Sequence, residues 1–487
     1  MAKRKEIHYD SVQRIKQAGQ VFTPQCLVET MLDLCGYFGN ICSKHVIDNS
    51  CGDGVFLCEV VRRYCKYYLN NNDNKIQLKL NLETYIHGIE LDEQTYNQCI
   101  INLNEVVKEF DLQDISWDIN NADALDMKKY NNKIDFVIGN PPYVRVHNLE
   151  KLYKKVKSYQ FAIGGMTDLY LVFFEIGFNM LNNKGNLCYI TPSSWLNSLA
   201  ATNLRKYIYN NCNLKALVDL GHFQAFKNAT TYTLISFFDM NYNSKYFDYY
   251  KYDAYTSTCC FNSKLQYSDI LINSKFYLSS IDNLRLLNDI KNGIHTQFVK
   301  VKNGFATLAD DVFISEQFPF DDYVIPIVKA STGKWKKCFF PYYSNAEPIE
   351  KDILFANDEL AKYLNKNKNK LLKNHTEQEY PTWYLFGRTQ ALKDVFNNKY
   401  SVNAIIKDIN SIKLNFVARG SGVYSGLYIL TNISYDIIKY VLLSNDFITY
   451  LKLLKNYKSG GYYTYNSKDL EQYLNYKITK IVTKINE

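Results

Sequence analysis

Short apolar runs alternate with longer amphipathic stretches from residue 12 to about residue 240. The apolar runs predict strands at 46–48, 85–90, 134–139, 186–191, 214–220 and 231–239. The amphipathic stretches predict helices at 54–68, 93–107, 167–181 and 201–209. Such alternation is typical of an α/β domain in which helices flank a parallel sheet. We expect the strand at 231–239 to complete this sheet.

The regular alternation ends near residue 270, and mixed elements with Gly-rich connections follow it. We therefore predict two domains, 1–270 and 271–487, the second of α+β type. Lys- and Asn-rich stretches such as 362–373 are expected to be solvated loops. The second part also carries the charge: residues 1–270 hold 28 basic and 28 acidic side chains, so the whole net charge of +8 falls on 271–487. That part is the candidate for contact with a polyanion.

Composition excludes several classes of protein. Hydrophobic residues make up 47% of the chain, too many for a disordered protein. The twelve cysteines form no CxxC pair and no Cys-His cluster, so we expect no metal site. Apolar runs are too short to span a membrane and none resembles a signal peptide. These features indicate a cytoplasmic protein with no membrane partner.

The most informative residues directly follow the predicted strand at 134–139. Asn140, Pro141, Pro142 and Tyr143 present an amide oxygen and a carbonyl oxygen on a segment whose prolines fix φ and lack N–H donors. Each oxygen could accept one N–H of an exocyclic amine, and Tyr143 could stack on an aromatic base. The tetrapeptide therefore indicates methylation of an amino nitrogen. It also fits an ordinary turn after a strand.

A second candidate is the loop at 48–56, which joins the first predicted strand to its helix. Gly52 and Gly54 would let the backbone approach a ligand closely. The loop lacks the phosphate-binding pattern GxxxxGK[ST], and its dinucleotide fingerprint is incomplete. Asp48 before the loop favours a cationic ligand such as S-adenosylmethionine over a pyrophosphate.

Three further polar residues lie at the ends of predicted elements. Glu90 ends the second strand, where a carboxylate commonly binds ribose hydroxyls. Asp123 could accept a hydrogen bond from an adenine amine, and Thr23 precedes a helix whose free N–H groups could bind a carboxylate. Taken singly, each residue also fits a structural role as a strand end, a turn residue or an N-cap.

In this order the motifs resemble the gamma-class DNA adenine-N6 methyltransferases, the TaqI-like type of bacterial restriction-modification systems. The resemblance is carried by residues 19–24, 48–56, 88–92, 121–123, 139–143, 167–170 and 184–192, and it is looser beyond residue 240. It implies a Rossmann-like S-adenosylmethionine-dependent methyltransferase domain followed by a C-terminal target-recognition domain.

The resemblance also implies residue roles. It assigns to S-adenosylmethionine Thr23, Asp48, Ser50, Gly52, Gly54, Glu90, Leu91, Asp123, Ala124 and Asn140. It assigns to an extruded adenine Asn140, Pro141, Pro142 and Tyr143, with Phe226 closing over the other side of the ring. Two features depart from the family pattern. Ala124 stands where the family often has a large apolar residue, and the spacing around Phe226 drifts, so Phe223 is an alternative.

The implied activity is site-specific methylation of adenine N6 in double-stranded DNA, with the target base flipped out of the helix. Only 18 residues precede Gly19, so we expect no nuclease domain there. A separately encoded restriction endonuclease is one candidate partner, and the sequence leaves open whether such a nuclease exists. Three alternatives stay open. These are a glutamine methyltransferase acting on a protein such as a release factor, an RNA adenine methyltransferase, and a DNA-specificity subunit without catalysis.

Overall fold

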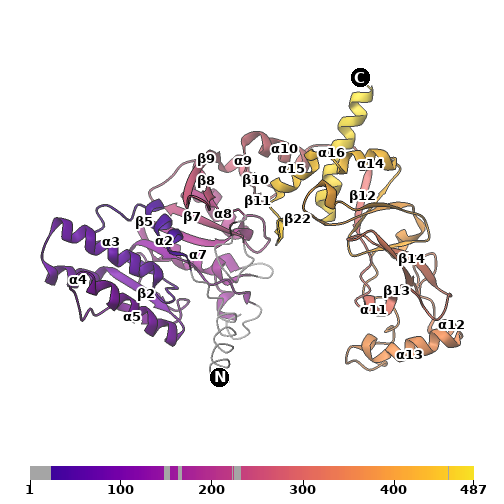
Figure 1. Ribbon diagram of the computed structural model, residues 1–487, viewed down its shortest axis with the longest axis horizontal. Coiled ribbons are helices and arrows are strands. Elements are labelled where there is room, and N and C mark those ends of the chain that lie inside the picture. The colour runs from indigo at the N-terminus through magenta and orange to yellow at the C-terminus, as the bar shows by residue number, and fades with distance from the viewer. Residues whose placement is uncertain are drawn as a thin grey trace. The chain divides into compact units, whose positions relative to one another are not determined.

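The computed structural model describes residues 23–146, 154–162, 167–221, 223, 232–458 and 460–486. The chain divides into two compact units between Leu284 and Arg285 (Figure 1). The first unit contains a large mixed sheet with helices on both faces, and the second contains several small sheets and helices. Phe226 lies outside the described residues. No helix of the described part of the chain is long and apolar enough to cross a membrane.

The sheet of the first unit has nine strands in the order β3-β2-β1-β4-β5-β7-β6-β8-β9. They are β1 (Val46–Asp48), β2 (Ile86–Glu90), β3 (Asp118–Asn121), β4 (Ile134–Gly139), β5 (Leu181–Pro192), β6 (Leu214–Asp219), β7 (Thr233–Asp239), β8 (Tyr246–Asp253) and β9 (Thr258–Gln266). The helices are α2 (Gln25–Leu34), α3 (Val55–Asn71), α4 (Lys75–Tyr85), α5 (Glu93–Lys108), α7 (Leu169–Met180), α8 (Thr202–Asn211) and α9 (Tyr267–Ile270). A two-stranded ribbon, β10 (Leu271–Ile272) and β11 (Lys275–Phe276), completes this unit.

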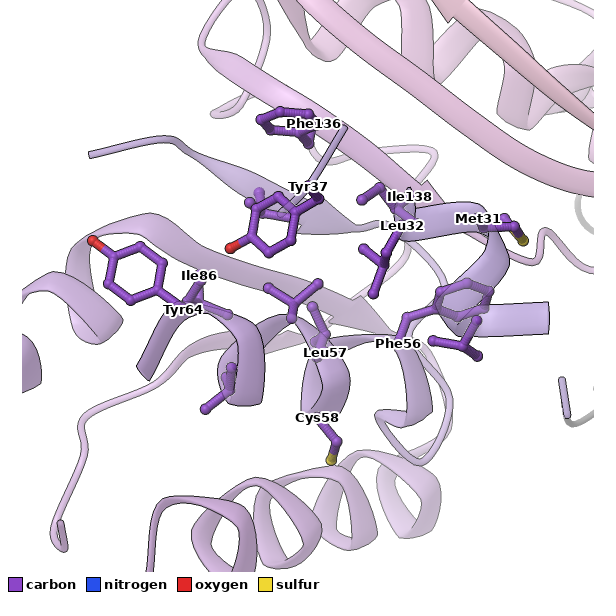
Figure 2. Packing of buried hydrophobic residues seen from close by; sticks show 14 of the residues in the cluster. Met31, Leu32, Tyr37, Phe56, Leu57, Cys58, Tyr64, Ile86, Phe136 and Ile138 are labelled. Carbon is purple, nitrogen blue, oxygen red and sulfur yellow. The ribbon is translucent and has the colours of Figure 1, made fainter. Parts of the chain in front are cut away.

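Alternating side chains give this sheet two apolar faces, because successive residues of a strand point to opposite sides. Phe136 and Ile138 of β4 join a core with α2, α3 and α5, part of which is drawn in Figure 2. On the other face, Phe174 of α7 packs against Phe238 and Tyr189, with ring centroids 6.0 and 5.5 Å apart. The sheet is therefore buried on both sides, and ligands have access at its edges.

Two expectations about this sheet are wrong. It is not parallel throughout, because β7 runs antiparallel between β5 and β6. It also does not end at residue 239, since β8 pairs with β6 and β9 pairs with β8. Burial alternates along part of β8, where Phe247 and Tyr249 point inward. In the sequence, the other tyrosines and the charged residues of β8 obscure this two-residue alternation.

The second unit has three sheets. Their strand orders are β12-β20-β16-β18, β13-β15-β14-β19 and β17-β22-β21. The first comprises β12 (Val299–Asn303), β16 (Lys399–Val402), β18 (Leu414–Val417) and β20 (Leu427–Thr431). The second comprises β13 (Ile314–Ser315), β14 (Val324–Lys329), β15 (Lys334–Phe339) and β19 (Gly422–Tyr424). The third comprises β17 (Ile405–Ile406), β21 (Tyr457–Lys458) and β22 (Tyr462–Thr464).

Helices accompany these sheets: α10 (Ile281–Asn292), α11 (Asp310–Phe313), α12 (Lys351–Phe355), α13 (Asp358–Leu372), α14 (Tyr435–Leu442), α15 (Asn445–Leu454) and α16 (Ser467–Asn486). The stretch at 362–373, expected to be a loop, falls within α13 up to Leu372. An aromatic-rich core of its own joins α11, α13 and the second sheet. Each unit therefore has a separate hydrophobic core.

Candidate active site

The candidate residues follow the carboxyl ends of four adjacent strands. Asp48 ends β1, Glu90 ends β2, Asp123 follows β3, and Asn140 follows β4. These strands are parallel and lie in the order β3-β2-β1-β4, so their carboxyl ends share one edge of the sheet. Between β1 and β4 the strand order reverses, and a ligand crevice forms at such a switch point in α/β sheets.

Asn140 is fixed by contacts from two other candidate residues. Its side-chain Nδ2 donates to Thr23 Oγ1 at 3.1 Å, and the Ser50 hydroxyl donates to its backbone oxygen at 3.4 Å. The amide nitrogen faces Thr23, and the amide oxygen at the other end of the group is the atom that could accept an amine N–H. The structure thus brings together Thr23, Ser50 and Asn140, which are far apart in the sequence.

Asp48 carries a buried carboxyl group beside these residues. Its Oδ1 accepts from the Ser50 N–H at 3.0 Å, and a Cβ on Gly139 would lie 2.5 Å from the same oxygen. Burial raises the pKa of the Asp48 carboxyl to about 8, and nearby Glu90 adds to the effect. No lysine or arginine of the described residues pairs with it. A buried carboxyl without a basic partner fits a cationic ligand.

The loop glycines differ in their surroundings. Gly52 has a φ of +57°, and an added Cβ would meet nothing within 4 Å, so its backbone borders open space. Gly54 has a φ of +87°, and a Cβ there would lie 2.7 Å from Cys99 Sγ of α5. Gly52 therefore fits close approach by a ligand such as S-adenosylmethionine, whereas Gly54 permits the close packing of α3 on α5.

Glu90 ties the loop at 48–56 to the end of β2. Its Oε2 accepts from the Gly52 N–H and its Oε1 from the Asp92 N–H, both at 2.9 Å. Burial raises the pKa of the Glu90 carboxyl, and these two donors oppose the rise. The Asn121 side chain donates to the Glu90 backbone oxygen at 2.9 Å. A carboxylate oxygen has two acceptor sites, so Glu90 can still accept ligand hydroxyls.

Asp123 has a partner that the sequence did not suggest. Lys155 Nζ lies 2.7 Å from Asp123 Oδ2 and also pairs with Asp126. The other Asp123 oxygen accepts from the Leu125 N–H at 2.9 Å. The neighbouring Ala124 is buried, and Leu91 is 65% exposed. An adenine amine at Asp123 would therefore share its carboxylate with a lysine.

Tyr143 has its hydroxyl anchored and its ring half-buried. The hydroxyl donates to the Ile190 backbone oxygen of β5 at 3.0 Å. Its ring meets that of Tyr170 edge to face, with centroids 6.3 Å apart. Pro141 is buried and Pro142 is half-buried. Phe223, the alternative to Phe226, packs against Tyr252 with ring centroids 5.2 Å apart.

Two side chains behind the site, Asn49 and Tyr170, support it although the sequence motifs assign them no role. Asn49 is buried and accepts from the Tyr189 hydroxyl at 2.9 Å, which braces the end of β1 against β5. The Tyr170 hydroxyl lies 3.0 Å from Ser194 Oγ. Asn49 lies within the motif at 48–56 and Tyr170 within the motif at 167–170, but neither had been given a role, so membership of a motif was the available signal.

Comparison with known proteins places the first unit in a functional context. Residues 58–226 match the Eco57I restriction-modification methylase family. The chain is 32% identical over 225 residues to the type II methyltransferase M.BstVI of Geobacillus stearothermophilus, covering 44% of this chain and 40% of that protein. It is 23% identical over 505 residues to the type II restriction enzyme and methyltransferase RM.Eco57I of Escherichia coli, covering 82% of this chain and 50% of that protein. The chain thus spans about half or less of these relatives.

Two solved structures share the fold at low sequence identity. The type IIL restriction-modification enzyme MmeI, solved with DNA, aligns with a TM-score of 0.60 and 14% identity over 91% of this chain and 63% of its own. A nuclease-deletion mutant of the type ISP restriction-modification enzyme LlaGI, solved with a DNA substrate mimic, aligns with a TM-score of 0.53 and 14% sequence identity. The alignment covers 95% of this chain and 55% of the LlaGI chain. The predicted Rossmann-like fold and the resemblance to restriction-modification methyltransferases are confirmed, and these similarities support S-adenosylmethionine as the cofactor.

Proposed function

We propose, starting from a catalytic unit similar to restriction-modification methylases, that this chain methylates N6 of adenine at a specific site in duplex DNA. The observation that carries the proposal is the anchored Asn140 at the switch point between β1 and β4, beside buried Asp48. The residues of 1–270 would hold the cofactor and the base, and those of 271–487 would recognise the DNA.

The chain's own groups explain how an amine could react there. The Asn140 amide oxygen and the Pro141 carbonyl accept the two N–H groups of the amine, which turns its lone pair away from the ring. S-adenosylmethionine supplies an electrophilic methyl group. The amine nitrogen would form a bond to the methyl carbon as the sulfur–methyl bond breaks, S-adenosylhomocysteine would leave with that electron pair, and the nitrogen would lose one proton to water. Positioning and fixed dipoles carry the rate in this scheme, and no general base is required.

The target amine lies inside the double helix, so the base must leave the stack. Flipping costs a few kcal/mol, and stacking on an aromatic ring recovers about 1–3 kcal/mol per base. The half-buried ring of Tyr143, held by its hydroxyl at Ile190, is the proposed stacking surface. Phe226 is proposed for the opposite side of the ring.

The test is methyl transfer from radiolabelled S-adenosylmethionine to three acceptors: genomic DNA, total RNA and a protein extract. We expect label in DNA, in N6-methyladenine, at one sequence found by modification-sensitive sequencing. Asn140→Ala should abolish transfer yet bind the cofactor in calorimetry. Label in RNA or protein alone would establish one of the other methyltransferase assignments, and cofactor binding without transfer to any acceptor would indicate a specificity subunit.

A further inference from the structure

The second unit contains a hairpin end that carries two opposed lysines and a tryptophan. Strands β14 and β15 pair antiparallel, and their last pairs are Lys329 with Lys334 and Val328 with Trp335 (β14 is labelled in Figure 1). We call residues 329–335 the lysine-tryptophan turn. Like charges directly opposite each other on neighbouring strands destabilise a sheet. The Lys329–Lys334 pair is therefore unfavourable for the stability of the hairpin by itself.

Neighbouring lysines of the same strand have acidic partners, whereas these two do not. Lys336 pairs with Glu316 at 3.1 Å and Lys337 lies 3.7 Å from Asp321. Neither Lys329 nor Lys334 has an acidic partner within the described parts of the chain. Two opposed ammonium groups without counter-charge form a local site for an anion.

Trp335 adds an exposed aromatic surface at the same place. Its side chain is 44% exposed, on the face of the hairpin opposite to Lys334 because residues alternate along a strand. Tryptophan is usually well buried in a single chain and is enriched at binding surfaces. The turn therefore presents two charges and a large apolar ring within two adjacent cross-strand pairs.

The turn is held rigidly, as a binding element should be. Ala330 is fully buried and its N–H donates to the Tyr424 backbone oxygen at 2.9 Å. A Cβ on Gly426 would lie 2.5 Å from the Ala330 Cβ, so the turn sits directly on that backbone. Thr332 and Gly333 donate their N–H groups to the Lys329 oxygen at 3.0 and 2.8 Å. A backbone held in this way loses little entropy on binding.

We propose that the lysine-tryptophan turn contacts duplex DNA, with Lys329 and Lys334 on backbone phosphates at one face of the hairpin end and Trp335, on the other face, packed against sugar and base edges. The inference rests on the proposed function and names a surface for its substrate. Charge complementarity selects the partner, because the net positive charge of the chain lies in the part that contains this turn.

The test compares three variants of the full chain: Lys329→Ala with Lys334→Ala, Trp335→Ala, and the control Lys362→Ala with Lys366→Ala. The control removes two exposed lysines of α13 in the same unit. Affinity for a labelled duplex containing the methylated sequence is measured by anisotropy over a series of salt concentrations. Melting temperature and S-adenosylmethionine affinity serve as checks that each variant is folded.

We expect the Lys329 and Lys334 variant to lower the slope of log affinity against log salt by about 2, one per lost phosphate contact. Trp335→Ala should weaken binding about tenfold at every salt concentration without changing the slope. The control should retain wild-type slope and affinity. If all three variants match one another, the turn does not contact DNA and the inference fails, while wild-type methylation of the duplex leaves the proposed function intact. If the wild type neither binds nor methylates duplex DNA, the proposed function itself fails.

Discussion

Tyr143 has a hydroxyl that is fixed by a hydrogen bond and a ring that stays half-buried. Replacement by Phe removes one hydrogen bond to Ile190, worth about 0.5–1.5 kcal/mol of stability, and keeps the ring. Replacement by Ala also removes the proposed stacking surface, about 1–3 kcal/mol. We expect Tyr143→Phe to retain much of the methyl transfer and Tyr143→Ala to lose most of it.

Fluorescence of 2-aminopurine at the target position measures the Tyr143 prediction, since the signal rises when the base leaves the stack. The melting temperatures of both variants control for folding. Equal loss in Phe and Ala variants would mean that the hydroxyl anchor matters and stacking does not.

Asp48 gives a second prediction at this scale, concerning pH. Its pKa of about 8 in the folded protein lies far above the ordinary pKa of an aspartate, about 4, so the free folded protein binds more protons than the unfolded chain between these limits. From this group alone, stability falls as pH rises from about 4 to about 8. Asp48→Asn should therefore raise the melting temperature of the cofactor-free protein at pH 8 more than at pH 5.

Cofactor binding should also expel the Asp48 proton near neutral pH, because a cationic ligand favours the carboxylate. Calorimetry in two buffers of different ionisation enthalpy counts the protons released. The wild type should release about one more proton than Asp48→Asn at pH 7. An identical proton count in the two proteins would show that the cofactor leaves Asp48 protonated.

At the scale of elements, the sequence predicted those strands that a local pattern of apolar and polar residues specifies. The strands at 46–48 and 134–139 were located to the residue, because each is a short apolar run followed by a polar motif. Helix α13 was missed, although Leu360, Leu364 and Leu371 form a buried stripe and Asn357 caps its start. Its lysines and asparagines dominate the composition and mask that stripe.

Contacts between elements were beyond the sequence. Thr23 and Asn140 are 117 residues apart and meet only because α2 and β4 belong to one folded unit. Lys155 reaches Asp123 from a segment with no recognised motif. The motifs therefore indicated which strand ends carry chemistry, but not which side chains hold them in place.

Helix α7 supplies an element-scale prediction. Its Tyr170 lies edge to face with Tyr143, and its hydroxyl is bonded to Ser194. Buried Arg205 donates to the Trp195 and Ser198 backbone oxygens at 2.7 and 2.8 Å, which fixes the segment that carries Ser194. Tyr170 is thus a positioning residue for the ring of Tyr143. An aromatic pair of this kind contributes about 0.5–1.5 kcal/mol.

We expect Tyr170→Leu to lower kcat severalfold at unchanged S-adenosylmethionine affinity, and Tyr170→Phe to rescue it because the ring is retained. Ser194→Ala should resemble Tyr170→Phe, since both remove only the hydrogen bond. Single-turnover methyl transfer and calorimetry separate these effects. A Leu variant as active as the Phe variant would show that Tyr143 needs no support from α7.

At the scale of the whole chain, the two cores and the uneven charge predict a division of labour. Residues 281–487 carry 28 basic and 21 acidic side chains, whereas residues 1–280 carry 29 basic and 28 acidic side chains and are nearly balanced. Each unit also has its own hydrophobic core, which is the requirement for folding alone. A fragment of 281–487 should therefore bind duplex DNA with an affinity that falls steeply with salt. A fragment of 1–280 should bind S-adenosylmethionine and little DNA.

Gel-shift titrations of the two fragments over a salt series measure this division, with circular dichroism to establish that each is folded. Nonspecific attraction depends on phosphates alone, so the 281–487 fragment should bind unrelated duplexes almost as well as the methylated sequence at low salt. Preference for that sequence should emerge as salt rises, because base contacts resist screening better than charge pairs do. Stronger binding by the 1–280 fragment would reverse the assignment and direct attention to the lysines at 151–157, which follow Tyr143 in the sequence.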